Sequence, residues 1–318
     1  MKNENTLTFA GSVKEEIALK ERNSSQKRAL LASFLKLNGH IRFVKKQTQL
    51  TLDSESASIA KLLYSCINDV YHLPARFSYT RSAGFLKRVV YHVIVDGADV
   101  ILNDLHLDPL GDGVPEEESF WKEELPDYLT GAFLATGSVN DPMGKSYHLE
   151  IRCADENYAK WFAKAWGKAV GHAFTPKVAK RRNHYVVYLK SSEQISNFLI
   201  LVQAENACFY YEDVRVARDY RNVTNRLMNL DTANMSKSLS AGARQAEEIA
   251  FLKERGLLKK IRNPKSQILC ELRLKNPEMS LSDIADLLSK ELSATVSKSN
   301  VNHLFREIHA LYENEKNG

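Results

Sequence analysis

The side chains best suited to molecular recognition lie near the end of the chain, in Val296–Ile308, "VSKSNVNHLFREI". Val301, Phe305 and Ile308 recur at helical spacing and predict a buried face. Amide and guanidinium groups on the opposite face match the donors and acceptors of base edges in the major groove. The pattern therefore predicts a helix that reads DNA, and a small helical docking module is the alternative. The predicted contact residues are Ser297, Lys298, Ser299, Asn300, Asn302, His303 and Arg306.

Two further helices are predicted to position this one. The segment 266–275, "SQILCELRLK", stops at Asn276-Pro277, where a helix tends to end. The next begins with Ser280 as N-cap and Asp283 three residues later, as in a capping box. Ser297 or Ser299 would cap the last helix. The expected domain is all-α, covers residues 263–318, and contains a helix-turn-helix at about 279–312 whose turn is several residues longer than the usual three to four.

Positive charge is concentrated in the segment before this module. Residues 176–265 hold 17 Lys and Arg against 9 Asp and Glu, whereas residues 263–318 hold 7 against 8. Such a distribution indicates a polyanion partner or an ordinary solvated basic face. A nearly neutral module gains little from counterion release, so we expect residues 263–318 to bind weakly alone. The predicted backbone contacts are Lys177, Lys180, Arg181, Arg182, Arg218, Arg221 and Arg226.

An internal repeat precedes the basic segment. In each copy a helix ends at a glycine, Gly39 or Gly137, and is followed by strands, an amphipathic helix and further strands. The distance from that glycine to the proline before the later strands is 35 residues to Pro74 in one copy and 39 to Pro176 in the other. The order predicts an α+β domain of two αββαββ-type repeats, at about 27–100 and 122–200, joined by the linker 107–127.

The domain boundaries follow from these patterns. We expect the duplicated domain over 1–225, a helical linker over 226–262 and the C-terminal domain over 263–318. Within the helical region, the polar stretch Asp231–Ser236 predicts a break between two helices. The nearby arginines either line a groove or pair with acids such as Asp213 and Asp219.

The repeated helix, "LASFLKLNGHI" in one copy and "LTGAFLATGSV" in the other, resembles the LAGLIDADG motif of homing endonucleases. The resemblance implies that the two helices pack through small residues and that the strands form a saddle over DNA. In that family a carboxylate directly before the glycine holds divalent metal, because hard cations prefer anionic oxygen. Here those positions are Asn38 and Thr136, and the motif's other acid is replaced by Lys36 and Leu134. The implied small residues are Ala32, Ser33, Thr130 and Gly131.

Longer stretches give a closer resemblance. "LTGAFLATGSVNDPMGKSYHLEI", "RDYRNVTNRLMNLDTANMSKSLSAGARQ" and "VSKSNVNHLFREI" resemble the WhiA family of bacterial regulators of sporulation and cell division. The resemblance covers nearly the whole chain and implies a degenerate LAGLIDADG-type domain joined to a helix-turn-helix. After "VNH" this chain has Leu304-Phe305-Arg306-Glu307, where the family is rich in Arg and Lys.

The resemblance to the WhiA family implies a DNA-binding transcriptional regulator of cell division and chromosome organisation, and of sporulation in sporulating relatives, and the loss of the acids at Asn38 and Thr136 favours a non-enzymatic protein. The alternatives are a protein-docking or RNA-binding scaffold and an active LAGLIDADG endonuclease. The expected partners are double-stranded DNA and other division or transcription proteins, with no cofactor, metal or membrane. Four widely spaced cysteines indicate buried thiols rather than zinc or disulfides. Without a secretory signal or a long apolar run, the expected location is the cytoplasm, at the nucleoid.

Overall fold

The computed structural model describes residues 7–44, 47–81, 89–107, 123–169 and 173–317 of the chain. It divides into two compact units, Met1–Arg218 and Asp219–Gly318. Most of the linker expected at 107–127 lies outside the described residues, as do residues 85–88 of one expected strand. Among the helices that the structure describes, none is long and apolar enough to cross a membrane.

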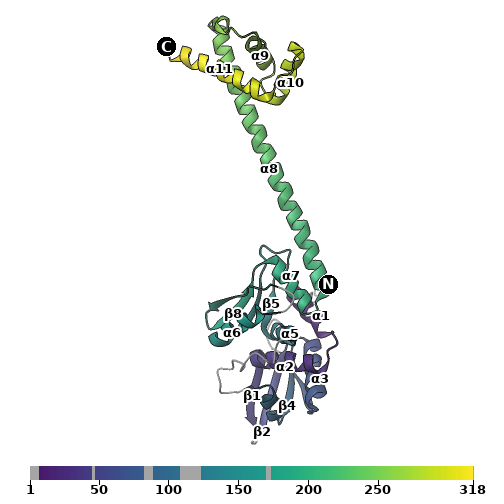
Figure 1. The fold of residues 1–318 in the computed structure, drawn as a ribbon. Coiled ribbons are helices and arrows are strands. Elements are labelled where there is room, and N and C mark those ends of the chain that lie inside the picture. The colour runs from purple at the N-terminus through teal and green to yellow at the C-terminus, as the bar shows by residue number, and fades with distance from the viewer. Residues whose placement is uncertain (1–6, 45–46, 82–88, 108–122, 170–172, 318) are drawn as a thin grey trace. The chain divides into compact units, whose positions relative to one another are not determined.

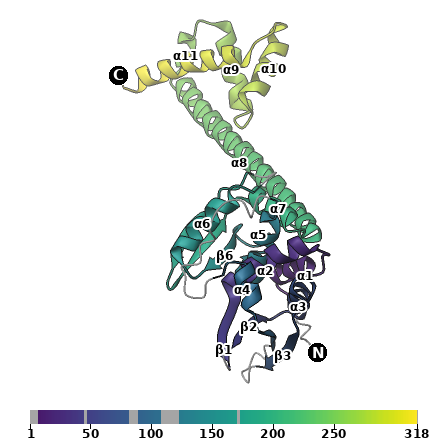
Figure 2. The ribbon, with the colours of Figure 1, turned by 60° about the horizontal axis from the view of Figure 1, so that its bottom comes forward.

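The first unit contains the predicted duplication, drawn in Figures 1 and 2. Each copy follows the order αββαββ, and each forms a four-stranded antiparallel sheet, ordered β1-β2-β4-β3 in one copy and β5-β6-β8-β7 in the other. The first copy consists of α2 (Ser24–Asn38), β1 (Gly39–Val44), β2 (Gln47–Ser54), α3 (Ala57–Tyr71), β3 (Ala75–Arg81) and β4 (Val89–Asp96). The second consists of α5 (Leu125–Thr136), β5 (Gly137–Val139), β6 (Leu149–Cys153), α6 (Glu156–Trp166), β7 (Lys177–Arg181) and β8 (His184–Leu189). The predicted fold class is confirmed.

Within the described part of the first unit, three shorter helices lie outside the repeating order. They are α1 (Phe9–Ala18), α4 (Asp99–Asp104) and α7 (Ser192–Leu201). The apolar face of α1 places Val13 and Ile17 in the same buried core as both repeats. The four cysteines are also buried and unpaired, and burial raises the pKa of the Cys66, Cys153 and Cys270 thiols to about 12.

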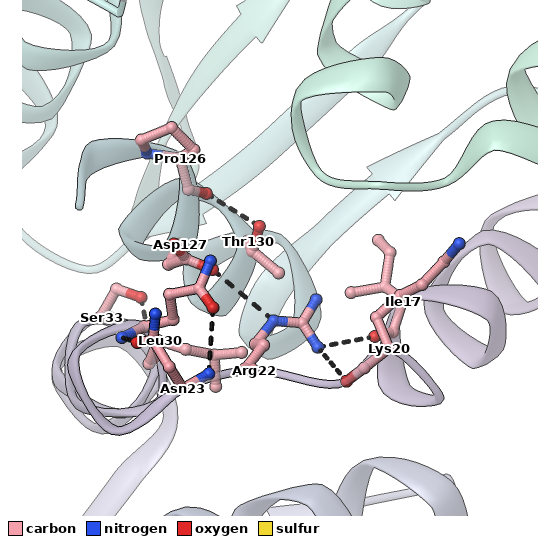
Figure 3. Close-up of polar contacts among 10 residues, drawn as sticks. Ile17, Lys20, Arg22, Asn23, Leu30, Ser33, Pro126, Asp127 and Thr130 are labelled. Carbon is pink, nitrogen blue, oxygen red and sulfur yellow. Dashed lines mark hydrogen bonds and ion pairs between the residues drawn. The ribbon is translucent and has the colours of Figure 1, made fainter. Parts of the chain in front are cut away.

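The helices α2 and α5 cross closely at the centre of the first unit. Thr130 and Ser33 are buried there, and each hydroxyl donates to a carbonyl one turn back on its own helix (Figure 3). A Cβ placed on Gly131 would lie 2.0 Å from the Leu30 carbonyl oxygen. Only glycine therefore lets α5 approach the α2 backbone this closely. Gly131 and Ser33, two of the small residues that the resemblance implied, meet at this crossing.

One buried ion pair joins the start of α2 to α5. Arg22 donates from Nη1 to the carbonyls of Ile17 and Lys20, both at 3.0 Å, and its Nε lies 3.6 Å from Asp127 Oδ1 (Figure 3). Burial raises the pKa of Asp127, and the Arg22 guanidinium opposes that rise. Asn23 caps α2 through a capping box with Gln26. These contacts set where α2 begins relative to α5.

The predicted break at Asp231–Ser236 is wrong, because α8 (Glu205–Glu254) is one uninterrupted helix (Figure 1). The polar side chains do not compete with the helix. Thr232 Oγ1 donates to the Met228 carbonyl at 2.8 Å, and Ser240 Oγ donates to the Ser236 carbonyl at 2.9 Å. A hydroxyl that bonds the carbonyl four residues back is satisfied within the helix.

The second unit is all-α. After α8 come the 3-10 turn η1 (Leu257–Lys260), α9 (Pro264–Lys275), α10 (Leu281–Leu292) and α11 (Lys298–Lys316). Its core includes Ile249 and Leu252 of α8 together with residues of α9, α10 and α11. A Cβ on Gly242 would lie 2.2 Å from the Pro277 carbonyl oxygen, so α8 also packs tightly against the loop after α9. The end of α8 is therefore part of this core.

Candidate nucleic-acid interface

The helix α11 presents one face to solvent. Ser297 is its N-cap and accepts from the Asn300 backbone N–H at 3.2 Å. Val301, Leu304, Phe305 and Ile308 are buried against α9 and α10. The predicted buried face is confirmed.

The structure brings four of the predicted contact residues onto one side of α11. Ser299, Asn302, His303 and Arg306 are spaced i, i+3, i+4 and i+7, the spacing of neighbours on one helical face. Ser299, His303 and Arg306 are exposed and Asn302 is half-buried. Among the described residues, no carboxylate lies within 4 Å of the Arg306 guanidinium, whereas His303 lies 3.4 Å from Glu307. We define these four residues as the α11 face.

The other three predicted residues of this helix lie off that face. The Ser297 hydroxyl is engaged in the cap, and Lys298 and Asn300 are exposed on the flanks of the first turn. At 100° per residue, Asn300 points away from Asn302 by roughly 160°. The N-terminal N–H groups of a helix suit an anion, so these flanks fit phosphate contacts better than base contacts.

A five-residue turn, Ser293–Ser297, connects α10 to α11. Ser293 has a φ of +50°, and Ser289 holds the turn by accepting from the Val296 N–H at 2.9 Å. The Ser289 hydroxyl also donates to the Ala285 carbonyl at 2.7 Å. The turn is one or two residues longer than the usual three to four, not several as the sequence predicts, and one side chain stabilises it.

A buried arginine that the sequence reasoning missed supports the same arrangement. Arg273 Nη1 donates to the Met279 carbonyl at 2.6 Å and to the Asn276 carbonyl at 3.2 Å. Its guanidinium carbon lies 5.2 Å from the centre of the Phe305 ring on α11, and burial lowers its pKa. The sequence pattern could have indicated that Arg273 is buried, because Arg273 follows Leu269 and Cys270 at the spacing of one apolar helical face.

The two degenerate acid positions lie at the ends of α2 and α5, where both side chains donate to a strand. Asn38 Nδ2 donates to the Asp53 carbonyl at 2.8 Å, and Thr136 Oγ1 donates to the Arg152 carbonyl at 2.7 Å. In each copy the acceptor is next to the residue that pairs with the glycine, since Gly39 pairs with Leu52 and Gly137 with Ile151. The equivalent bonds tether each helix end to its own sheet.

A lysine occupies the neighbourhood of the α5 end. Lys14 Nζ donates to the Leu134 carbonyl at 3.1 Å and lies 5.6 Å from the centre of the Phe133 ring. Burial lowers the pKa of Lys14 to about 8, with Glu55 opposing the shift. Among the described residues, no group of three or more His, Cys, Asp or Glu is arranged to hold a metal ion. The arrangement near α5 brings the Lys14 amine to the Leu134 carbonyl oxygen.

The predicted backbone-contact residues do not share one surface. Lys177 and Arg181 point to the open side of their sheet, and Arg181 lies 3.3 Å from Glu150. Lys180 alternates to the helix-covered side, 5.7 Å from the centre of the Tyr185 ring. Arg182 is in the hairpin turn with a φ of +49°.

The α8 arginines also separate. Arg218 donates to the carbonyls of Gly144 and Lys145, both at 3.0 Å, and stacks over the Tyr147 ring. This arginine therefore holds a loop of the first unit. Arg221 and Arg226 are exposed, and neither has a carboxylate within 4 Å among the described residues.

Comparison with known proteins identifies three matching domains. The profile of the WhiA N-terminal LAGLIDADG-like domain matches residues 24–108, that of the WhiA LAGLIDADG-like domain matches 125–221, and that of the WhiA C-terminal HTH domain matches 224–312. The last match takes in the α8 residues that join the second core. The chain therefore carries a helix-turn-helix domain after two LAGLIDADG-like domains.

Relatives match over almost the full length. The "Probable cell division protein WhiA" of Pediococcus pentosaceus is 35% identical over 312 residues, 96% of this chain and 99% of that protein. The protein of the same name from Enterococcus faecalis is 34% identical over 311 residues, 96% of this chain and 98% of that protein. A crystal structure of full-length DUF199/WhiA from Thermatoga maritima shares the fold at a TM-score of 0.58 and 21% identity, covering 96% of this chain and 98% of that one. This chain belongs to the WhiA family.

Proposed function

We propose that this protein is a DNA-binding transcriptional regulator that acts in cell division and chromosome organisation, with a nuclease-like scaffold that does not cut. Relatives are named as probable cell division proteins. In members from sporulating bacteria, the same activity would serve sporulation. Its place is the cytoplasm, on the nucleoid.

The observation that carries this proposal is the α11 face. Asn302 and Arg306 have the side-chain types that bond adenine and guanine edges, and a good bidentate pair discriminates by ~1–3 kcal/mol. The flanking Lys298 and the N-terminal N–H groups suit the phosphates on either side. Ser289 of α10 holds the turn before α11, and Arg273 of α9 packs on the Phe305 ring of α11, so both neighbouring helices support the face.

The absence of catalysis rests on the chemistry of two side chains. Asn38 and Thr136 carry no negative charge, and each uses its donor for a strand carbonyl. Metal-assisted hydrolysis of a phosphodiester draws on anionic oxygen ligands. The test is incubation of supercoiled plasmid with the protein and Mg²⁺, and we expect no nicking. Metal-dependent nicking that Asn38→Ala or Thr136→Ala abolished would support an active endonuclease instead.

Binding is tested with the full chain and DNA fragments recovered from genome-wide footprinting. Arg306→Ala should lose ~10-fold or more in affinity for a footprinted site, and should change affinity for random duplex far less. The control is Lys316→Ala, which removes one positive charge at the far end of α11. Equal losses for both variants on both DNAs would refute base readout by the α11 face.

The alternative of an RNA-binding or protein-docking scaffold predicts other outcomes. A scaffold would leave diffuse or no footprints, and an RNA binder would prefer single-stranded RNA over duplex DNA under the same salt. Regulator binding should fall steeply with salt, since phosphate contacts release counterions. Footprints that vanish in Asn302→Ala/Arg306→Ala, while transcripts of the adjacent genes change, would support regulation.

A further inference from the structure

The middle of α8 exposes a stripe of large apolar side chains. Tyr220, Val223, Leu227 and Leu230 are 76%, 53%, 57% and 57% exposed. Their spacing of three, four and three residues is that of alternate a and d positions in a heptad repeat. Apolar side chains aligned in this way on a protein surface mark an interaction site. The period identifies the matching surface as another helix.

We propose that this stripe is the seam through which two copies of the chain associate as a parallel, in-register, two-stranded coiled coil. The seam consists of Tyr220, Leu227 and Asn234 at a positions and Val223 and Leu230 at d positions. A single asparagine among apolar a residues fixes register and favours two strands, because its amide is satisfied by the same amide of the other helix. Asn234 is exposed in the single chain.

Charges beside the seam fit a second copy in the same orientation. Arg226 precedes Leu227 at a g position, and Asp231 follows Leu230 at an e position. In a parallel pair each g residue faces the e residue five positions further along the other helix. Arg226 of each copy therefore meets Asp231 of the other, twice per dimer. Within one chain, neither residue has an oppositely charged partner within 4 Å among the described residues.

The α8 helix is already formed along this stretch, so association does not have to order it. An isolated helix of about two heptads, the length of the seam, is marginal in water. Much of the free-energy cost of forming a short coiled coil from separate chains is therefore the cost of forming its helices. Between Asp219 and Lys237 every residue except Thr224 is exposed. The seam covers little more than two heptads, so we expect a reversible dimer that depends on protein concentration.

Two exposed methionines outside the seam allow its specific association to be distinguished from non-specific hydrophobic association. Met228 and Met235 are 62% and 66% exposed, but both are at b positions, outside the a/d seam. If exposure alone drove association, these residues would matter as much as Leu227 and Leu230. They serve as matched controls.

Disulfide cross-linking tests the geometry. Leu227→Cys and Asn234→Cys, each in the full chain, should form a covalent dimer under mild oxidation, because equivalent a residues face each other in register. Met228→Cys should not, and the four native cysteines are buried and do not compete. An antiparallel pair could cross-link equivalent residues at one point of the seam but not at both. Cross-linking at neither position, or at only one of them, would overturn the proposal.

Sedimentation equilibrium tests association without modification. The native chain should rise from 36.1 kDa toward twice that mass with concentration, while Leu227→Glu/Leu230→Glu stays at the monomer mass. Arg226→Asp should weaken the dimer, and adding Asp231→Arg should restore it. Met228→Glu should behave as the native chain. A native monomer at every soluble concentration, or equal effects of Met228→Glu and the double variant, would refute the seam. Unchanged circular dichroism checks that the variants keep their helices.

Discussion

Replacement of Gly131 by alanine tests the closest contact in the fold. An alanine Cβ at this position would lie 2.0 Å from the Leu30 carbonyl oxygen and 2.3 Å from Ser33 Oγ. The hydroxyl can rotate, but the carbonyl moves only with α2. Normal contact between carbon and oxygen is more than 3 Å, so the two helices would have to separate by about 1 Å in a close-packed interior.

The expected change in the free energy of unfolding follows from two opposing contributions. Overpacking a core costs ~1–3 kcal/mol and occasionally more, and the backbone contact favours the upper end. Alanine regains ~1 kcal/mol over glycine in helix propensity. We therefore expect a net loss of about 2 kcal/mol. In a domain of this size that lowers the melting temperature by roughly 4–8 °C.

Tryptophan fluorescence isolates the unit concerned, because Trp161 and Trp166 lie in the first unit and the sequence has no tryptophan after residue 166. The control is Gly167→Ala, where the nearest atoms to the new Cβ are 3.5 Å away and the backbone is already helical. We expect that control to keep or slightly raise the midpoint. A Gly131→Ala midpoint equal to the native one, or one that Ser33→Ala fully restores, would refute a clash with the backbone.

Three further changes test other parts of the structure. Because the pKa of Lys14 is lowered, the unfolded chain binds more protons than the native chain between pH 8 and 10.5. The free energy of unfolding, measured in urea, should therefore rise by up to ~3 kcal/mol over that range relative to Lys14→Met. A gain as large in the variant would rule out Lys14 as the source. Gly242→Ala should cost the second unit ~1–3 kcal/mol, seen in its thermal unfolding, because the new Cβ meets the Pro277 carbonyl; no loss would contradict this packing. A fragment 241–318 should fold cooperatively, whereas 263–318, which lacks Ile249 and Leu252, should lack its near-ultraviolet signal; equal folding would refute a role for α8 in the core.

The duplicated fold was readable from the sequence because its signals are local and occur twice. A helix that ends at Gly39 or Gly137, followed by alternating strands, depends on neighbouring residues only. The repeated order then required no knowledge of long-range packing. The caps of the C-terminal helices were predictable for the same reason, since Ser280 occupies its predicted N-cap position and Ser297 is one of the two residues predicted to cap α11.

The directions of side chains and the continuity of α8 were harder to predict from the sequence. The stretch Asp231–Ser236 has a turn-forming composition, yet α8 continues through it, and the Thr232 hydroxyl is satisfied by the Met228 carbonyl of the same helix. Lys180 belongs to a basic cluster in sequence, but strand alternation sends it to the other side of the sheet from Lys177. A cluster of charges along a strand cannot be taken as one surface until its register is known.

The same lesson applies to the ends of α2 and α5. From sequence, Asn38 and Thr136 are defined by what they lack, namely the carboxylate of a nuclease. In the structure each makes an equivalent bond to its own sheet, Asn38 to the Asp53 carbonyl and Thr136 to the Arg152 carbonyl. A carboxylate at either place would have no donor to offer and would face a carbonyl oxygen, an unfavourable contact between acceptors. Restoring the acids would therefore work against the present packing, in which Asn38 and Thr136 each hold a helix end to its own sheet.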